Sequence, residues 1–387
     1  MRIILATPFE NRLAKRGTRF IDIANLLASK GAEVHYFTTD FSHAYKKHFS
    51  KASIERDSID QLYKTYYLHV SGYRKNISFT RVWSNFSMSL NFYRVLSRFV
   101  MEGDIIMIPS RPVDFIYYIS LLKKRKSGIT LVMDIRDVWP DSFKKKNIFF
   151  STYCNFFLKR SVRYFDRFFH ISPSFTKWLT RYKPDASSLF VPPGFNQERW
   201  SHSVCKCLTY LYPMKIAFVG SLQYQLDILP FVKAIGNDLN YILGIIGEEG
   251  NGQRYLEVKR YIETNKIKNV VFHGIVEPER VPEILKEYNM GLIPMISSSM
   301  TNKLFDYIAA YLPIFVLGEN DTADFVKKNN IGWISSFKVR EIKETLDNIT
   351  LQDMTTKASN LLAIRKSFSR ELLYTNIAKV IFSIQNE

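Results

Sequence analysis

Residues 298–313 read SSMTNKLFDYIAAYLP and lie between two short apolar runs, residues 291–294 and 314–317. The apolar runs predict buried strands, and the stretch between them predicts a loop that leads into a helix at about residues 301–310. The first turn of a helix attracts anions through its free backbone N–H groups, and Lys303 adds a positive charge there. The stretch therefore predicts a diphosphate site, unless it is an ordinary amphipathic helix whose charges are merely solvated.

The alternation of apolar runs and helical stretches continues in both directions along the chain. Further strands are expected in eight apolar runs, at residues 2–7, 34–38, 104–109, 129–134, 167–172, 215–219, 241–246 and 270–273. Helices are expected between these runs and at the end of the chain, at residues 20–30, 113–124, 227–235, 255–264, 281–288 and 368–384. Apolar strands that do not alternate, separated by helices, are typical of parallel sheets covered on both faces.

These elements predict an α/β protein with two doubly wound, Rossmann-like domains that face a central cleft. The chain has 387 residues, which exceeds one ordinary core and suits two domains. We expect the N-terminal domain at residues 1–195 and the C-terminal domain at residues 196–367. A final helix at residues 368–387 could pack back on the N-terminal domain. The Pro- and Gly-containing segment 191–194, with the irregular residues 200–213, is the expected hinge.

The composition also limits the cellular setting. The three cysteines exclude a disulfide scaffold, and none stands in a zinc-like set with histidines. The opening residues, MRIILATPF, read as a strand rather than as a signal peptide, and no apolar run is long enough to span a bilayer. We therefore expect a protein of the reducing cytoplasm.

The net charge of +18 is concentrated in one half of the chain. Residues 1–195 contain 32 Lys and Arg against 15 Asp and Glu, a net charge of +17. Residues 196–387 contain 22 against 21, a net charge of +1. A domain with such a field attracts polyanions, and composition alone leaves nucleic acid, anionic lipid and a phosphorylated substrate open.

One candidate site in the basic half follows the strand at residues 129–134, because ligands of open parallel sheets bind beyond the carboxyl ends of the strands. Asp134, Arg136 and Asp137 are expected to form one polar cluster there. Arg136 suits phosphate recognition, and Asp137 suits orienting or deprotonating an acceptor hydroxyl. The alternative is a salt-bridged strand end.

A second candidate is the loop at residues 8–19, which surrounds Gly17 with four cations: Arg12, Lys15, Arg16 and Arg19. Four cations in one such loop fit an acceptor that carries phosphate. The alternative is a solvated basic loop without a ligand.

Two further stretches of the basic half combine cations with aromatic residues. Residues 73–101 hold five Lys or Arg and no acid, and residues 143–169 hold seven Lys or Arg, including residues 144–146, among eight phenylalanines. This pattern is typical of helices that bind the surface of an anionic membrane. It could instead stack on single-stranded nucleic acid, or belong to buried helices with a basic outer face.

The run NKLFDYIAAYLPIF, preceded by FVGSL and followed by GEND, resembles the donor domain of family-4 glycosyltransferases, which have the GT-B fold. The similarity continues in order along most of the chain, through these motifs: ATPFENRLAKRGTRF, DIRDVWPDS, VPPGF, Gly220-Ser221, Gly247-Glu248 and Gly318-Glu319. The motif DIRDVWPDS resembles O-antigen and capsule sugar transferases in particular.

This resemblance implies a glycosyltransferase of the hexosyl or N-acetylhexosaminyl type that acts in cell-surface polysaccharide synthesis. The donor is then a nucleotide-sugar, a UDP-sugar, and the acceptor is a saccharide or a polyprenyl-diphosphate-linked saccharide. Retention at the anomeric carbon is implied, with no metal and no other cofactor. Because acceptors of this family are commonly lipid-linked, we expect peripheral binding to an anionic membrane surface at the inner face of the plasma membrane, and no nucleic acid.

The resemblance also implies roles for individual residues. Catalytic roles fall to Asp137, Arg136 and Lys303. The donor is expected to contact residues that follow strands of the C-terminal domain: Gly220, Ser221, Gly247, Gly274, Ser298, Asn302, Lys303, Leu304, Asp306 and Glu319. The acceptor is expected to contact four residues of the N-terminal domain: Arg16, Gly17, Arg19 and Asp134.

The donor site departs from the usual pattern of the family. Two glutamates eight positions apart are usual there, and this chain has Ser298 and Asp306 at the corresponding positions. Asp306 suits accepting hydrogen bonds from ribose hydroxyls. No Arg or Lys follows Gly220 directly, so Lys303 and helix N–H groups are expected to carry more of the diphosphate contact.

Two other functions remain open on the sequence. A sugar-nucleotide 2-epimerase with the GT-B fold would use the same architecture, but it gives no reason for the +17 of one half. A basic nucleic-acid-binding protein would explain the charge, but neither the stretch 298–306 nor the tandem sheets.

Overall fold

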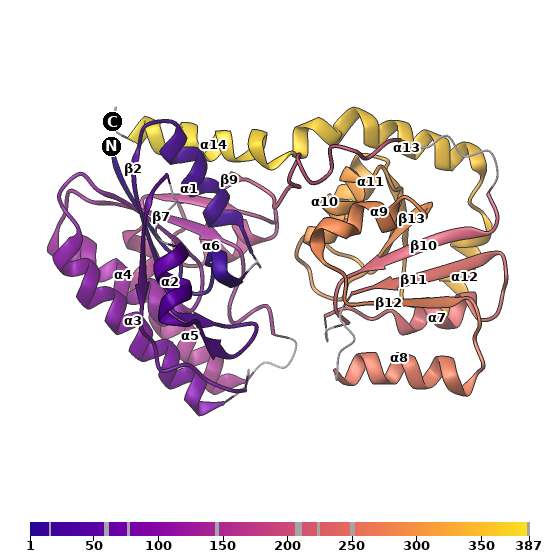
Figure 1. Cartoon of the computed structure of the whole chain (residues 1–387), viewed down its shortest axis with the longest axis horizontal. Helices are drawn as coiled ribbons and strands as arrows, with labels where there is room; N and C mark the ends of the chain where they lie inside the picture. Colours follow the sequence, from indigo (N-terminus) through magenta and orange to yellow (C-terminus); the bar gives the residue numbers. More distant parts are fainter. Residues whose placement is uncertain are drawn as a thin grey trace. The chain divides into compact units, whose positions relative to one another are not determined.

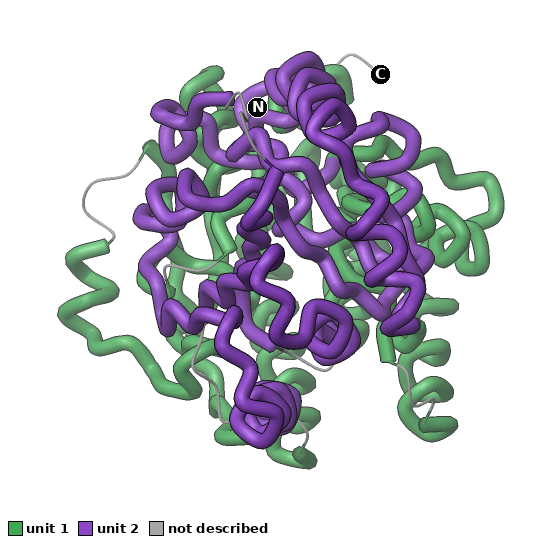
Figure 2. Tube along the Cα trace, turned by 90° about the vertical axis from the view of Figure 1, so that its right-hand side faces the viewer, with its two compact units in different colours: residues 1–191, 374–387 green, residues 192–373 purple. Residues whose placement is uncertain are grey.

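The computed structural model describes residues 1–14, 17–57, 62–75, 78–143, 147–205, 211–222, 225–247 and 252–384. The chain forms two compact units, which Figure 2 shows in different colours. The first comprises Met1–Val191 with the end of the chain from Tyr374, and the second comprises Pro192–Leu373. Each unit is built on its own parallel sheet, so the predicted pair of doubly wound α/β domains is confirmed.

The sheet of the first unit has seven strands in the order β5-β2-β1-β6-β7-β8-β9, and every pairing is parallel. The strands are β1 (Arg2–Ala6), β2 (Glu33–Thr39), β5 (Lys64–Leu68), β6 (Ile105–Pro109), β7 (Thr130–Ile135), β8 (Arg167–His170) and β9 (Leu189–Phe190). A short antiparallel hairpin, β3 (Phe41–Ser42) with β4 (Lys47–His48), follows β2. The central strands β1 and β6 are buried almost throughout, as the unbroken apolar runs predicted.

Helices of the first unit connect the strands and cover the sheet (Figure 1). They are α1 (Arg19–Ser29), α2 (Lys51–Asp57), α3 (Phe79–Phe99), α4 (Val113–Arg125), α5 (Ile148–Ser161), α6 (Phe175–Thr180) and most of α14 (Arg370–Ser383). Helices α3, α4 and α5 pack side by side. Each returns from the carboxyl edge of the sheet to its amino edge, so all three helices begin at the edge where ligands of such sheets bind.

The sheet of the second unit has six parallel strands in the order β12-β11-β10-β13-β14-β15. They are β10 (Met214–Val219), β11 (Tyr241–Ile246), β12 (Val270–Gly274), β13 (Met290–Pro294), β14 (Ile314–Leu317) and β15 (Gly332–Ser335). The helices are α7 (Leu229–Ile235), α8 (Gln253–Thr264), α9 (Val281–Leu285), α10 (Asn302–Ala309), α11 (Asp321–Lys328), α12 (Val339–Asp347) and α13 (Leu351–Arg365). In Figure 1, α7 and α8 lie below this sheet, and α10 and α11 lie above it.

Tyr307 fixes helix α10 on the sheet. Its ring lies over Gly291, where a β-carbon would come within 2.4 Å of the ring, so no larger residue fits. Its hydroxyl lies 2.9 Å from the carbonyl oxygen of Ala217 in β10 and 3.2 Å from that of Leu292 in β13, and it accepts a hydrogen bond from Val219 N at 3.1 Å. The hydroxyl therefore bridges β10 and β13 and holds α10 on the sheet.

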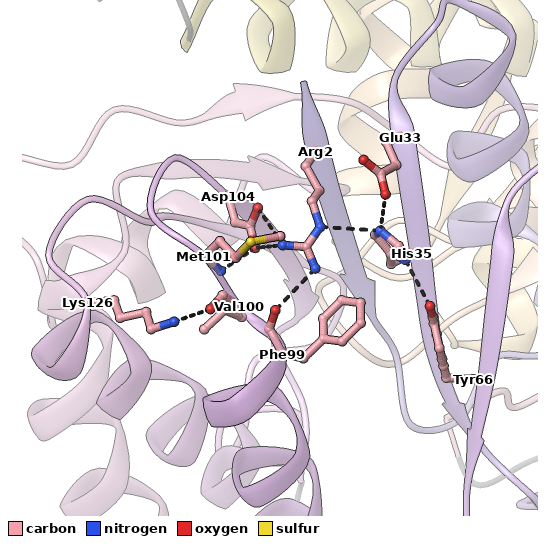
Figure 3. A network of polar contacts seen from close by, with 9 residues as sticks. All are labelled: Arg2, Glu33, His35, Tyr66, Phe99, Val100, Met101, Asp104 and Lys126. Carbon is pink, nitrogen blue, oxygen red and sulfur yellow. Dashed lines mark hydrogen bonds and ion pairs between the residues drawn. The ribbon is translucent and has the colours of Figure 1, made fainter.

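A polar network, shown in Figure 3, closes the amino edge of the sheet in the first unit. This edge is opposite the carboxyl edge, where ligands of such sheets bind. The Arg2 guanidinium donates to Asp104 at 3.0 Å and to the Phe99 carbonyl at 3.1 Å, and its Nε approaches His35. The network extends over the starts of three strands and the adjoining loops through Glu33, Tyr66, Val100, Met101 and Lys126. Because it lies away from the ligand edge, we interpret it as structural.

Candidate functional site

In the second unit, glycines end three neighbouring strands at the carboxyl edge. Gly220 follows β10, Gly247 follows β11, and Gly274 ends β12. The N–H of Gly220 donates to Ile246 O at 2.7 Å, and the N–H of Gly247 donates to Gly274 O at 3.0 Å. A β-carbon on Gly247 would lie 2.5 Å from Gly220 O, so this close approach of two loops requires glycine. The strand order places these three glycines at one edge of the sheet, and their contact with the donor stays a prediction.

Lys303 reaches from the first turn of α10 onto this row of glycines. Gly220 has a φ of +115°, and a β-carbon there would lie 2.8 Å from Lys303 Nζ. The ammonium group also lies 5.5 Å from the centre of the Phe218 ring. Among the described residues, it makes no hydrogen bond and no ion pair. Burial lowers the pKa of Lys303 to about 8, although Asp306 opposes that shift.

Asp306 lies one turn further along α10 and is half-buried. Burial raises the pKa of its carboxyl group to about 6, against the opposing charges of Arg370, Arg199 and Lys303. Within the part of the chain that the structure describes, this carboxylate accepts no hydrogen bond from a side chain. The site thus pairs a half-buried cation with a half-buried acid, and among the described residues neither charge is compensated by a direct contact.

The other predicted donor residues have different surroundings. Ser221 follows Gly220 and is half-buried, whereas Asn302 is exposed at the start of α10. Ser298 is exposed, and its carbonyl accepts a hydrogen bond from Asp321 N at 3.0 Å. Glu319 is exposed after β14 and lines an open pocket at this edge. Leu304 is fully buried, so its side chain belongs to the core and can affect a ligand only through its backbone.

In the first unit, two ion pairs lie at the carboxyl edge of β1 and β7: one joins the predicted acceptor residues Arg19 and Asp134, and the other joins Arg136, predicted to be catalytic, to Glu10. Arg19 donates to both carboxylate oxygens of Asp134, at 2.8 and 2.9 Å, and both side chains are buried. Arg136 donates to Glu10 Oε2 at 2.6 Å, and its side chain remains 28% exposed. Burial alone would lower the pKa of Arg19, but Asp134 and then Tyr374 raise it, so the guanidinium stays charged.

Glu10 is a site residue that the sequence reasoning missed. Its Oε1 accepts the backbone N–H of Phe20 at 2.6 Å, within the first turn of α1, while Oε2 holds Arg136. Gly17 passes close above it, since a β-carbon there would lie 3.7 Å from Oε2. The available signal was a single acid in an otherwise basic loop that follows a strand. Arg16, with Lys15 beside it, lies outside the described residues, as do residues 144–146 and Glu248.

Asp137 does not join Arg136 in the cluster that the sequence predicted. Its carboxylate accepts hydrogen bonds from Arg111 at 3.1 Å, Trp139 Nε1 at 3.2 Å and its neighbour Val138 N at 3.0 Å, and also from Ser142. These four donors fill the acceptor positions of a carboxylate. Asp137 therefore holds the loop after β7, and its role as a base stays a prediction.

A comparison with protein-family models finds no match. The chain is 25% identical over 287 residues to the alpha-galactosylglucosyldiacylglycerol synthase of Streptococcus pneumoniae (strain ATCC BAA-255 / R6), which covers 67% of this chain and 73% of that protein.

Solved structures resemble the whole chain. Sucrose-phosphate synthase from Thermosynechococcus elongatus has a TM-score of 0.75 at 12% identity, and the match covers all of both chains. The lipopolysaccharide outer core galactosyltransferase WaaB has a TM-score of 0.67 at 14% identity. Anabaena HepE in complex with UDP-glucose has a TM-score of 0.68 at 13% identity, and each of these two matches covers 99% of both chains.

Fold and comparisons together define the class: the chain has the GT-B fold, and the resemblance to GT-B glycosyltransferases is confirmed. The chain is a glycosyltransferase of the GT-B type.

Proposed function

We propose that this protein transfers a sugar from a UDP-sugar, bound by the second unit, to a saccharide or lipid-linked saccharide acceptor, bound by the first. The observation that carries the proposal is the Lys303 ammonium group, half-buried against Gly220, with no acid of the described residues in contact with it. A diphosphate supplies the missing negative charge. The structures of Anabaena HepE in complex with UDP and with UDP-glucose support this choice of donor.

In this proposal the second unit stabilises the leaving group by fixed charges. Lys303 and the backbone N–H groups at the start of α10 meet the charge that develops on the diphosphate as the glycosidic bond breaks. The close glycine loops let the backbone approach the phosphates, and Asp306 accepts hydrogen bonds from ribose hydroxyls. This arrangement needs no bound metal, and we propose retention at the anomeric carbon.

The first unit supplies the acceptor side of the reaction. Arg136 is the more accessible of the two paired guanidinium groups, so we propose that it contacts a phosphate of the acceptor while Glu10 holds it in place. Arg19 and Asp134 are too deeply buried to bind a ligand directly, and they fix the start of α1 beneath the acceptor. Gly17 and Arg16, in the loop before α1, complete the proposed acceptor site, and Asp137 orients the loop after β7.

We further propose that the first unit binds the inner face of the plasma membrane peripherally. None of the described helices is long and apolar enough to cross a membrane. Apolar side chains are nevertheless exposed at the starts of α3 and α5, which we call the apolar tips: Phe79, Val82 and Trp83 on α3, and Ile148 and Phe149 on α5. Phe79 is 93% exposed and Phe149 is 84% exposed, which is costly in water without a partner.

Contacts within the first unit connect the two tips. Arg81 of α3 lies 5.9 Å from the Trp139 ring, and Phe150 of α5 lies 5.6 Å from the same ring. Exposed cations, Arg74 and Lys75, precede α3. Apolar insertion combined with attraction to anionic headgroups suits an interfacial surface, and the relative named for glycolipid synthesis supports a lipid-linked acceptor.

The proposed transfer is tested with purified protein, a set of UDP-sugars and polyprenyl-diphosphate-linked saccharides in anionic vesicles. The proposal expects UDP release and a longer lipid-linked product only when both substrates are present. Formation of a C2 epimer from the UDP-sugar without acceptor would contradict it and favour the epimerase alternative. Retention is read from the anomeric configuration of the product.

A further inference from the structure

A cluster of one carboxylate and two imidazoles lies outside the proposed transfer site, at the carboxyl end of β2 and β5. Asp40 follows β2, His48 ends the hairpin strand β4, and His69 follows β5. His48 Nδ1 lies 3.1 Å from Asp40 Oδ1, and His69 Nδ1 lies 2.7 Å from Asp40 Oδ2. The two imidazole rings stack with their centres 5.2 Å apart.

We propose that Asp40, His48 and His69 form a binding site for a divalent transition-metal ion, for which Zn²⁺ is the natural probe. One ligand atom of each residue lies within 4.8 Å of the other two. Tetrahedral Zn²⁺ with bonds of about 2.0–2.1 Å holds its ligand atoms roughly 3.3 Å apart, so small rotations of the two exposed rings complete the geometry. Two imidazole nitrogens and one carboxylate oxygen suit Zn²⁺, Co²⁺, Ni²⁺ or Cu²⁺ rather than Mg²⁺ or Ca²⁺.

Hydrogen bonds with the backbone fix the position of Asp40 as a proposed metal ligand. Its N–H donates to Leu68 O at 3.1 Å, its carbonyl accepts from Phe49 N at 2.8 Å, and its Oδ1 accepts from Val70 N at 3.3 Å. Contacts with neighbouring residues also hold the two histidines in place. The ring of His48 packs 5.1 Å from that of Phe41, and the carbonyl of His69 accepts a hydrogen bond from Asn91 of α3 at 3.2 Å.

The bound ion would act on structure rather than on glycosyl transfer. It would cross-link three segments that the chain otherwise joins by hydrogen bonds: the end of β2, the β3–β4 hairpin and the end of β5. Three protein ligands leave a coordination position open to water. The histidines are partly exposed, His69 by 79% of its side chain, so the ion should exchange with solvent rather than be locked in.

The test uses the full chain, stripped of metal with a chelator and titrated with Zn²⁺ against a chromophoric competitor. We expect one equivalent to bind and to raise the melting temperature, because an ion that binds only the folded state stabilises it. His69→Ala and His48→Ala should each weaken binding at least about tenfold and remove most of the thermal shift. His202→Ala changes an exposed histidine of the second unit, and it should leave both measurements unchanged.

His69→Ala removes a mostly exposed side chain, so its fold is expected to persist, and circular dichroism checks this. Failure of the wild-type chain to bind Zn²⁺ would overturn the proposal and leave the cluster as hydrogen bonds only. Equal Zn²⁺ affinity in the wild type, His48→Ala and His69→Ala would also overturn it. So would an equal thermal shift with Mg²⁺, which would indicate a non-specific cation effect.

Discussion

The ammonium group of Lys303 lies against the α-carbon of Gly220, so that a β-carbon at Gly220 would be only 2.8 Å from Nζ. The cation comes from a helix and the glycine from the end of a strand, and no other described residue neutralises the charge by direct contact. Substitutions at Lys303 and Gly220 therefore test the proposed donor site most directly.

Lys303→Ala should abolish sugar transfer and weaken UDP binding by about 10- to 100-fold, the usual value of a charge-assisted hydrogen bond. Stability should change little, because the ammonium group has no hydrogen-bond or ion-pair partner among the described residues. Calorimetry with UDP and a transfer assay measure the two effects. Lys328→Ala, at an exposed position of α11, is the control, and near-normal turnover of Lys303→Ala would refute the assigned role.

Gly220→Ala should weaken UDP binding for a different reason. Its φ of +115° strains any residue with a side chain, and the new methyl group would displace Lys303. Gly103→Ala is a matched control, because Gly103 also has a positive φ, of +84°, but nothing lies within 4 Å of its added β-carbon. Both variants should lose about 1 kcal/mol of stability from strain, but only Gly220→Ala should lose UDP affinity. Equal UDP affinity in both variants would contradict the contact.

UDP affinity should depend on pH through Lys303. Burial lowers the pKa of this group from 10.5 to about 8, so the free protein loses the charge as the pH rises through 8. Because the diphosphate binds the protonated form, affinity should fall above pH 8, by about tenfold per pH unit once Lys303 is neutral. Lys303→Arg keeps its charge in this range and should give a flat profile between pH 7 and 9. The same slope in both proteins would assign the titration to another group.

The buried pair Arg19–Asp134 should matter for stability far more than an exposed pair. Asp134→Asn leaves the Arg19 guanidinium buried without its counter-charge, which costs about 3–5 kcal/mol. Asp141→Asn breaks the exposed pair with Arg181 and should cost less than about 1 kcal/mol. Denaturant unfolding of the two variants measures the difference. Similar losses would show that the Asp134 carboxylate is not the main counter-charge of Arg19.

The architecture and the donor helix could be predicted from the sequence because they depend on local pattern. Unbroken apolar runs gave the parallel strands, and the helix expected at residues 301–310 is α10, Asn302–Ala309. The pairing of Glu10 with Arg136 could not be predicted in this way, because the two residues are 126 positions apart and meet only through the order of strands in the sheet.

Asp137 did not join the expected grouping with Asp134 and Arg136, because donors of its own loop, Val138, Trp139 and Ser142, hold its carboxylate. The prediction that the aromatic stretch 73–101 binds the membrane surface also covered too many residues. Met88, Phe92 and Leu96 form the buried face of α3, and only the start of the helix exposes large apolar groups.

The apolar tips should therefore be the part of the chain that holds it on anionic vesicles. Phe79→Ser with Trp83→Ser removes the two large exposed aromatics of α3 while leaving its buried face intact, so the fold should persist. We expect the double variant to remain in the supernatant when anionic vesicles are sedimented, whereas the wild type sediments with them. Leu239→Ser, at a position 75% exposed in the second unit, controls for a general loss of surface hydrophobicity. Undiminished sedimentation of the double variant would exclude the start of α3 as the membrane contact.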